Sequence, residues 1–100
     1  MAAHHLITTH MNRTVITVVG KDTIGIIAAV CTYLAENNVN ILDITQTTLR
    51  DYFTMMMIVD INNCNVPFSE LRDGLAAVGQ SKGLEIKCQK EEIFNQMHRI

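Results

Sequence analysis

The stretch from Val15 to Val30 constrains most strongly what this chain can fold into. An apolar run ends at Gly20, a polar turn follows, and a segment with helical apolar periodicity begins at Ile24. This order predicts a strand, a tight turn and a helix. Asp22 or Thr23 is expected to cap the helix start, because a short side-chain oxygen accepts a hydrogen bond from an otherwise orphan backbone N–H.

Gly25 lies in the first turn of this predicted helix, where a glycine costs about 1 kcal/mol relative to alanine. Two arrangements would offset that cost. Another backbone packs closely there, or a small anionic group approaches the free N–H groups at the helix end. The first makes Gly25 structural and the second makes it part of a binding site.

Composition excludes several classes of function. The chain has 100 residues, enough for one domain with one modest core, and 48% of them are apolar. The net charge is −2, with 8 basic and 10 acidic residues, so nucleic acid is not expected as a direct partner. The sequence lacks an apolar run long enough for a membrane span, and its start does not have the pattern of a signal peptide.

The three cysteines, Cys31, Cys64 and Cys88, lie far apart and without CxxC spacing. A disulfide framework or a structural zinc site is therefore not expected. Reduced thiols fit a cytoplasmic protein, and Cys31 and Cys88 are interpreted as small buried hydrophobic residues.

Both ends differ from the central segment. Residues 1–12 are interpreted as a leader, disordered or tag-like, although His4, His5 and His10 leave a metal site as an alternative. Residues 91–100 form an amphipathic pattern that predicts a short helical tail. A helix of that length is marginal alone, so the tail is expected to pack on the domain or on a partner subunit.

The central segment predicts six elements. Residues 13–19 are apolar at both parities, which indicates a central strand, and residues 24–36 form the first helix, ended by Asn37 and Asn38. Residues 39–49 and 52–61 predict a hairpin. In its second strand one face is wholly apolar and should meet the helices, whereas the other face is mixed. The residues of the first face are Phe53, Met55, Met57, Val59 and Ile61, and the apolar ones of the second are Tyr52, Met56 and Ile58.

Pro67 suits the first turn of a second helix, with Gly79 and Gly83 at its frayed end, and residues 84–89 form the last strand. The order is that of an α+β, ferredoxin-like βαββαβ fold: a four-stranded antiparallel sheet with two helices on one face. Right-handed crossovers place the first and third strands in the centre. The apolar residues on the second sheet face favour a homodimer, formed by sheet stacking or by strand edges.

Residues 13–90 resemble the ACT domain family, the small ligand-sensing modules of amino-acid metabolism. The segment Gly20-Lys-Asp-Thr-Ile-Gly-Ile26 resembles the family's turn G-x-D-x-x-G-I, and Val39-Asn-Ile41 matches the start of its second strand. The segments 52–56 and 93–98 are similar to those of small stand-alone ACT proteins of bacteria and archaea. Those proteins in turn resemble the repressor of the glycine-cleavage operon and the ACT segment of formyltetrahydrofolate deformylase.

The resemblance implies a ligand site between the strand-to-helix turn and the second strand of a neighbouring subunit. Helix-end N–H groups and Gly25 would receive a ligand carboxylate, Asp22 would meet an ammonium group, and Asn40 could serve either. The full candidate set is Asp22, Gly25, Ile26, Asn40 and Ile41. Many members carry Arg-Pro where this chain has Thr23-Ile24, which removes one anion contact. For Asp22, Gly25 and Asn40 the purely structural roles of cap, packing point and turn residue stay open.

Catalytic residues, a metal site and a cofactor are not expected, because His98 is the only histidine outside the leader and the carboxylates are scattered. Met55, Met56 and Met57 cannot share one ion, since consecutive strand residues point to opposite faces. Together with the family resemblance, the sequence therefore favours a non-catalytic, homodimeric regulatory domain that binds a small molecule, with amino acids as the expected ligands. The alternatives are a ligand-free dimerisation or protein-interaction module and an accessory regulatory subunit of a metabolic enzyme.

Overall fold

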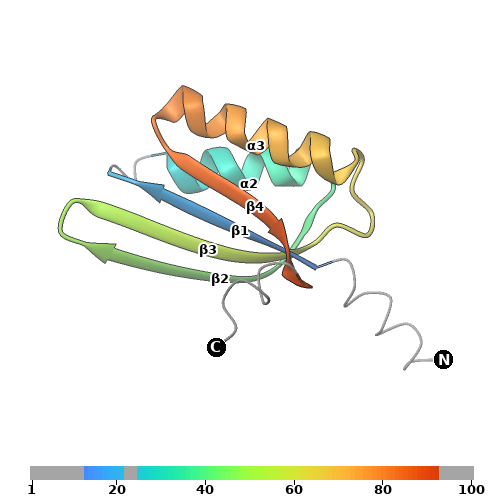
Figure 1. The fold of residues 1–100 in the computed structure, drawn as a ribbon, viewed down its shortest axis with the longest axis horizontal. Helices are drawn as coiled ribbons and strands as arrows, with labels where there is room; N and C mark the ends of the chain where they lie inside the picture. The colour runs from blue at the N-terminus through green and yellow to red at the C-terminus, as the bar shows by residue number, and fades with distance from the viewer. Residues whose placement is uncertain (1–12, 22–24, 93–100) are drawn as a thin grey trace.

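The fold, given by a computed structural model, is described here for residues 13–21 and 25–92 (Figure 1). Its elements follow the predicted order βαββαβ. They are β1 (Arg13–Gly20), α2 (Ile26–Glu36), β2 (Asn40–Leu49), β3 (Tyr52–Asp60), α3 (Phe68–Lys82) and β4 (Glu85–Lys90). The predicted leader, most of the predicted tail and the capping residues Asp22 and Thr23 lie outside the described residues. None of the described helices is long and apolar enough to cross a membrane.

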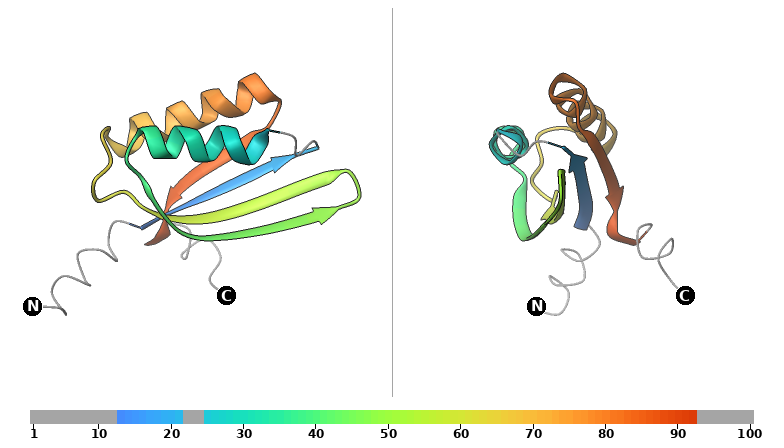
Figure 2. Two further views of the ribbon diagram at one scale, coloured as in Figure 1. Left: turned by 180° about the vertical axis from the view of Figure 1, so that it is seen from behind. Right: turned by 90° about the vertical axis from the view of Figure 1, so that its left-hand side faces the viewer.

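The four strands form one antiparallel sheet in the order β2-β3-β1-β4, so β1 and β3 are central, as predicted. Both helices cover the same face of this sheet (Figure 2). α2 lies over the side that carries β2, and α3 lies over the side that carries β4. The ferredoxin-like prediction is confirmed.

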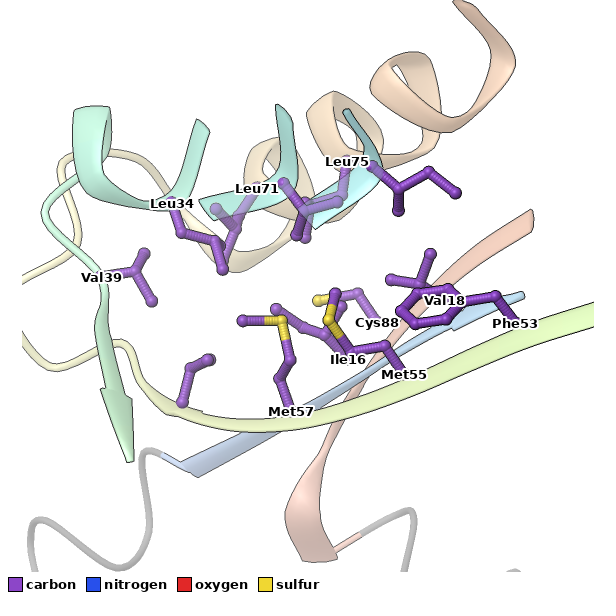
Figure 3. Packing of buried hydrophobic residues seen from close by; sticks show 13 residues of the cluster. Ile16, Val18, Leu34, Val39, Phe53, Met55, Met57, Leu71, Leu75 and Cys88 are labelled. Atoms are coloured by element: carbon purple, nitrogen blue, oxygen red, sulfur yellow. The ribbon is translucent and has the colours of Figure 1, made fainter. Parts of the chain in front are cut away.

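The core fills the space between the helices and the sheet (Figure 3). Phe53, Met55, Met57 and Val59 of β3 are all buried and point to the helices, whereas Met56 between them is exposed on the opposite face. This alternation confirms the predicted faces of β3. The helices contribute Ile26, Val30, Leu34, Leu71 and Leu75, and β4 contributes Cys88.

Asparagine and arginine residues in the left-handed conformation close two of the connections. α2 ends at its cap residue Asn37, and Asn38 follows with φ 61°. Arg50, in the predicted tight turn between β2 and β3, has φ 57°. Asn38 also donates from its side-chain amide to the carbonyl oxygen of Asn63 at 2.9 Å, which ties the end of α2 to the loop after β3.

Three predicted boundaries need correction. The first helix begins at Ile26, two residues later than predicted, because Gly25 is its non-helical cap residue. Pro67 is likewise the cap residue before α3 and not part of its first turn. The placement of Gly79 at a frayed helix end was wrong: it is buried within α3, and only Gly83, with φ 72°, ends the helix. Gly79 is needed because β4 passes close to it.

The sheet face away from the helices, here called the open face, carries alternate residues of each strand. Its exposure is uneven: Val15 is only 4% exposed, whereas Met56 is 37% and Tyr52 is 55% exposed. The prediction that this face is mixed, neither core nor plain surface, is confirmed.

Candidate functional site

α2 begins directly after a glycine, Gly25, which is its cap residue. Gly25 has φ 75° and ψ −7°, in the left-handed region that suits glycine, and it is exposed. Its carbonyl oxygen accepts the first helical hydrogen bond, from the N–H of Ala29 at 2.9 Å. A glycine has no side chain to cap the helix, so Gly25 itself cannot satisfy the first N–H groups of α2.

The two explanations first considered for Gly25 must be revised. A Cβ atom built on Gly25 would meet no atom within 4 Å, so the close-packing explanation is wrong. Gly25 is also not a helical residue, and its place is explained by its positive φ, which costs other residues roughly 1–2 kcal/mol. Open space above this glycine is compatible with an approaching ligand.

The local electrostatics favour an anion. A helix start carries about half a positive charge from its aligned peptide dipoles. The first turn of α2 contains no acidic residue that would neutralise this charge. The start of α2 is held against β1, because Ile26 is 2% exposed and its Cδ1 atom lies 3.7 Å from the Cβ position of Gly20. Ile26 therefore belongs to the core, and it fixes where the helix N–H groups point.

Asn40 and Ile41 lie at the opposite end of the sheet. Asn40 is exposed at the start of β2 opposite Asp60, and Ile41 is half-buried opposite Val59. α2 runs the length of the sheet between Gly25 and this end, and its 11 residues span about 16 Å. Within one chain the described candidates therefore form two separate groups, Gly25 with Ile26 and Asn40 with Ile41, and Asp22 lies outside the described residues.

The outer edge of β2 is an apolar feature that the sequence analysis did not assign to the site. Leu42 is 43% and Ile44 is 39% exposed, and a β-bulge between Ile41 and Asp43 shifts the register beside them. Large exposed apolar side chains on an unpaired strand edge are typical of a surface that another chain covers. The run Ile41-Leu42 together with Ile44 was the available sequence signal, because strict alternation would place Ile41 on one face and Leu42 and Ile44 on the other.

Two further features adjoin the turn. A groove of about 560 Å³ begins at Gly25 and follows α2 beside the end of α3, with small residues such as Ala28 and Ala29 and the charged Glu36 and Lys82 in its lining. The ammonium group of Lys21 lies 5.8 Å from the ring centre of Tyr52, a cation–π contact that fixes the start of the turn against β3.

The cysteines show no sign of reactive chemistry. Cys31, Cys64 and Cys88 are free thiols, and Cys88 is 6% exposed within the core. Burial raises the pKa of the Cys88 thiol from 9.0 to about 11, an effect that the Arg72 charge opposes and Cys64 reinforces. Such a thiol stays protonated and is a poor nucleophile at neutral pH. Within residues 13–21 and 25–92, His, Cys, Asp and Glu form no group of three or more that could hold a metal ion.

The fold defines a class: a ferredoxin-like α+β domain, here with an exposed left-handed glycine directly before its first helix. The chain belongs to the ACT domain family, a family of small-molecule-binding regulatory domains, and the family model matches residues 12–89.

The chain is also similar to individual proteins. It is 56% identical over 90 residues to the UPF0237 protein of Bifidobacterium longum, covering 90% of this chain and 100% of that protein. Its fold matches the ACT domain protein from Streptococcus pneumoniae with a TM-score of 0.73 and 44% identity, over 82% of this chain and 92% of the other. A candidate glycine cleavage system transcriptional repressor matches with a TM-score of 0.69 and 26% identity, over 78% of this chain and 44% of the other. The resemblance to small stand-alone ACT proteins is thus confirmed.

Proposed function

We propose that this chain is a non-catalytic, cytoplasmic regulatory domain that binds an amino acid at the interface of a homodimer. The observation that carries the proposal is the β1–α2 turn, where Gly25 adopts φ 75° and leaves open space above the start of α2. A ligand carboxylate suits this position, because it would accept hydrogen bonds from the first helical N–H groups and meet the positive helix end.

The topology supports a site shared between two chains. β2 is an edge strand and runs parallel to β1, so its last residues lie at the same sheet end as Gly25. If two β2 edges pair antiparallel across a two-fold axis, the start of the partner's strand reaches that end. A second copy would then supply the Asn40 and Ile41 that the same chain holds far from its own turn.

The pairing would also cover the apolar edge of β2. Leu42 and Ile44 would leave water, and the outer N–H and C=O groups of the strand would gain partners. In this arrangement the side-chain amide of Asn40 can donate to the ligand carboxylate or accept from its ammonium group, and Asp22 meets the ammonium group. Binding would hold the two chains in one relative position, and that change is what a partner protein could sense.

A thermal-shift screen with the twenty standard amino acids, supplied one at a time, tests the proposal. A ligand at 100 times its dissociation constant should add about 2.7 kcal/mol of stability. Gly25→Val should remove the response, because its side chain would occupy the space above the helix start. Failure of every amino acid to raise the melting temperature of the parent chain would contradict the proposal.

Gly83→Val is the matched control. Gly83 also has a positive φ, 72°, and nothing within 4 Å of its Cβ position, but it ends α3 and is not in the lining of the groove at Gly25. Both variants therefore carry a similar backbone strain, of roughly 1–2 kcal/mol. Gly83→Val should keep the ligand response that Gly25→Val loses. Equal loss in both variants would assign the effect to strain and not to a binding site.

The exposed edge of β2 also favours a second candidate, a dimerisation or protein-interaction module without a ligand, and an accessory subunit of a metabolic enzyme would use the same edge. Leu42→Lys separates these from the sensor. Under the module hypothesis it abolishes assembly, as seen by light scattering, while the parent chain shows no amino-acid response. Under the sensor hypothesis it abolishes assembly and the response together.

A further inference from the structure

The open face of the sheet is buried at one end although the described helices lie on the other face (Figure 2). Val15 pairs with Ile58 and Gln89, so it points away from Ile16 and Met57, which face the helices. It is nevertheless 4% exposed, and it is not a member of the core cluster between helices and sheet. Something other than the described helices therefore covers this end of the open face.

A charged pair at the same end is partly withdrawn from water, although the Arg13 side chain as a whole is 38% exposed. Arg13 lies two residues before Val15 on the open face, and its guanidinium group forms an ion pair with Glu91 at 3.8 Å. The Glu91 side chain is only 16% exposed, and the Nε atom of Arg13 is buried. Tyr52, at the other end of the face, is 55% exposed. Burial is thus concentrated where the chain leaves β4.

We propose that residues 93–100 of the same chain pack over Val15, Ile58 and their neighbours on the open face. Glu91 is two residues beyond Gln89, the strand partner of Val15, which places it about 7 Å along the strand from that pair. In helical form residues 93–100 span about 12 Å, enough to cross the buried end and leave Tyr52 uncovered. Their apolar residues recur at helical spacing: Ile93, Phe94, Met97 and Ile100.

This placement favours edge pairing over sheet stacking, the two modes of dimerisation that the sequence left open. A tail over one end of the open face leaves Tyr52 and Met56 exposed, but it keeps a second copy from lying flat against the whole face. The edge of β2, with Leu42 and Ile44, is an apolar surface that the tail leaves free for a partner chain. The inference does not depend on any ligand, so it can fail while the proposed binding site stands.

Amide chemical-shift mapping of the full chain tests the placement. Phe94→Asp should shift the amides of Val15, Thr17 and Ile58 while the oligomeric state by light scattering stays the same. The matched control is Gln96→Asp, a polar position of the same segment, which should leave those amides unchanged. If Phe94→Asp unfolds the domain, Phe94→Ala provides the same comparison with a smaller loss. Shifts confined to β2, or a loss of the dimer, would overturn the proposal.

Two further experiments distinguish the segments that could cover the open face. A chain that begins at Met11 should leave the Val15 amide unchanged; a shift there would show that residues 1–10 are the cover. Isotope-labelled Phe94→Asp protein mixed with unlabelled parent chain should keep its shifted amides, because a tail that packs on its own chain cannot restore them. Restoration would place the tail on the partner subunit and overturn the proposal.

Discussion

The main-chain N–H of Leu84 donates to the carbonyl oxygen of Gly79 at 2.7 Å, and the carbonyl oxygen of Leu84 lies 2.9 Å from the position of a Cβ on Gly79. This contact joins the end of α3 to the start of β4. Gly79 is therefore a glycine at which a neighbouring backbone group approaches closely, whereas Gly25, which was first considered for that role, has open space above it.

Gly79→Ala should destabilise the domain. The added methyl group would meet a backbone carbonyl, and Ile86 Cγ1 at 3.1 Å leaves little room on the other side. Overpacking of this kind costs roughly 1–3 kcal/mol, more than the gain of about 1 kcal/mol in helix propensity. Urea unfolding monitored by circular dichroism measures the difference. A variant as stable as the parent would show that β4 yields easily at this point.

Thr14→Val should stabilise the domain by about 1 kcal/mol. Thr14 is completely buried on the helix-facing side of β1, and its hydroxyl lacks a hydrogen-bond partner among the described residues. Replacing a buried unpaired hydroxyl by a methyl group of the same shape removes a desolvation cost. Thr17→Val, at a half-buried position of the open face, is the control and should change the melting temperature little. A destabilised Thr14→Val would mean that the hydroxyl has a partner in the folded protein.

Stability should fall above pH 9 because of Cys88. Its folded pKa is raised to about 11 by burial, from an ordinary value of 9.0 that applies to the unfolded chain. The unfolded thiol therefore loses its proton first, so the contribution is fully present below pH 9 and is lost as the pH rises through 11. Cys88→Ala should lower stability at pH 7, by loss of packing, but should show a smaller further loss between pH 9 and 11. Parallel pH profiles for the two proteins would contradict this assignment.

The fold was predictable from sequence because local signals agreed with one another. The alternation of Phe53, Met55, Met57 and Val59 assigned the buried face of β3, and its central position followed from handedness. Helix starts were predicted less well. The apolar periodicity predicts that the first helix includes Ile24. The positive φ of Gly25 is not helical, so the helix begins only at Ile26. Apolar spacing carries no information about a backbone dihedral angle.

The candidate site was predictable only in part. The turn sequence identifies Gly25 as special, and the structure supplies a reason, its left-handed conformation, that sequence alone could not distinguish from close packing. The position of Asn40 at the other end of the sheet follows from the parallel relation of β1 and β2, a long-range property of the topology. The predicted strand order already made β2 an edge strand, but the β-bulge between Ile41 and Asp43, beside the exposed Leu42 and Ile44, could not be predicted from the apolar run alone.

A mixing experiment tests most directly whether the ligand site is shared between two chains. Gly25→Val removes the part of the site at the start of α2, and Asn40→Ala removes the part at the start of β2. Each homodimer should therefore fail to bind the amino acid that raises the melting temperature of the parent protein. A mixed dimer combines one intact turn with one intact Asn40 from the other chain.

Calorimetric titration of the two variants after refolding together gives the decisive value. Random mixing makes half of the dimers mixed, and each mixed dimer has one intact site, so roughly a quarter of the parent binding capacity should return. Recovery at that level is the result our account predicts. If both variants are inactive alone and the mixture, shown by mass spectrometry to contain mixed dimers, binds no ligand, the site lies within one chain and the account is contradicted.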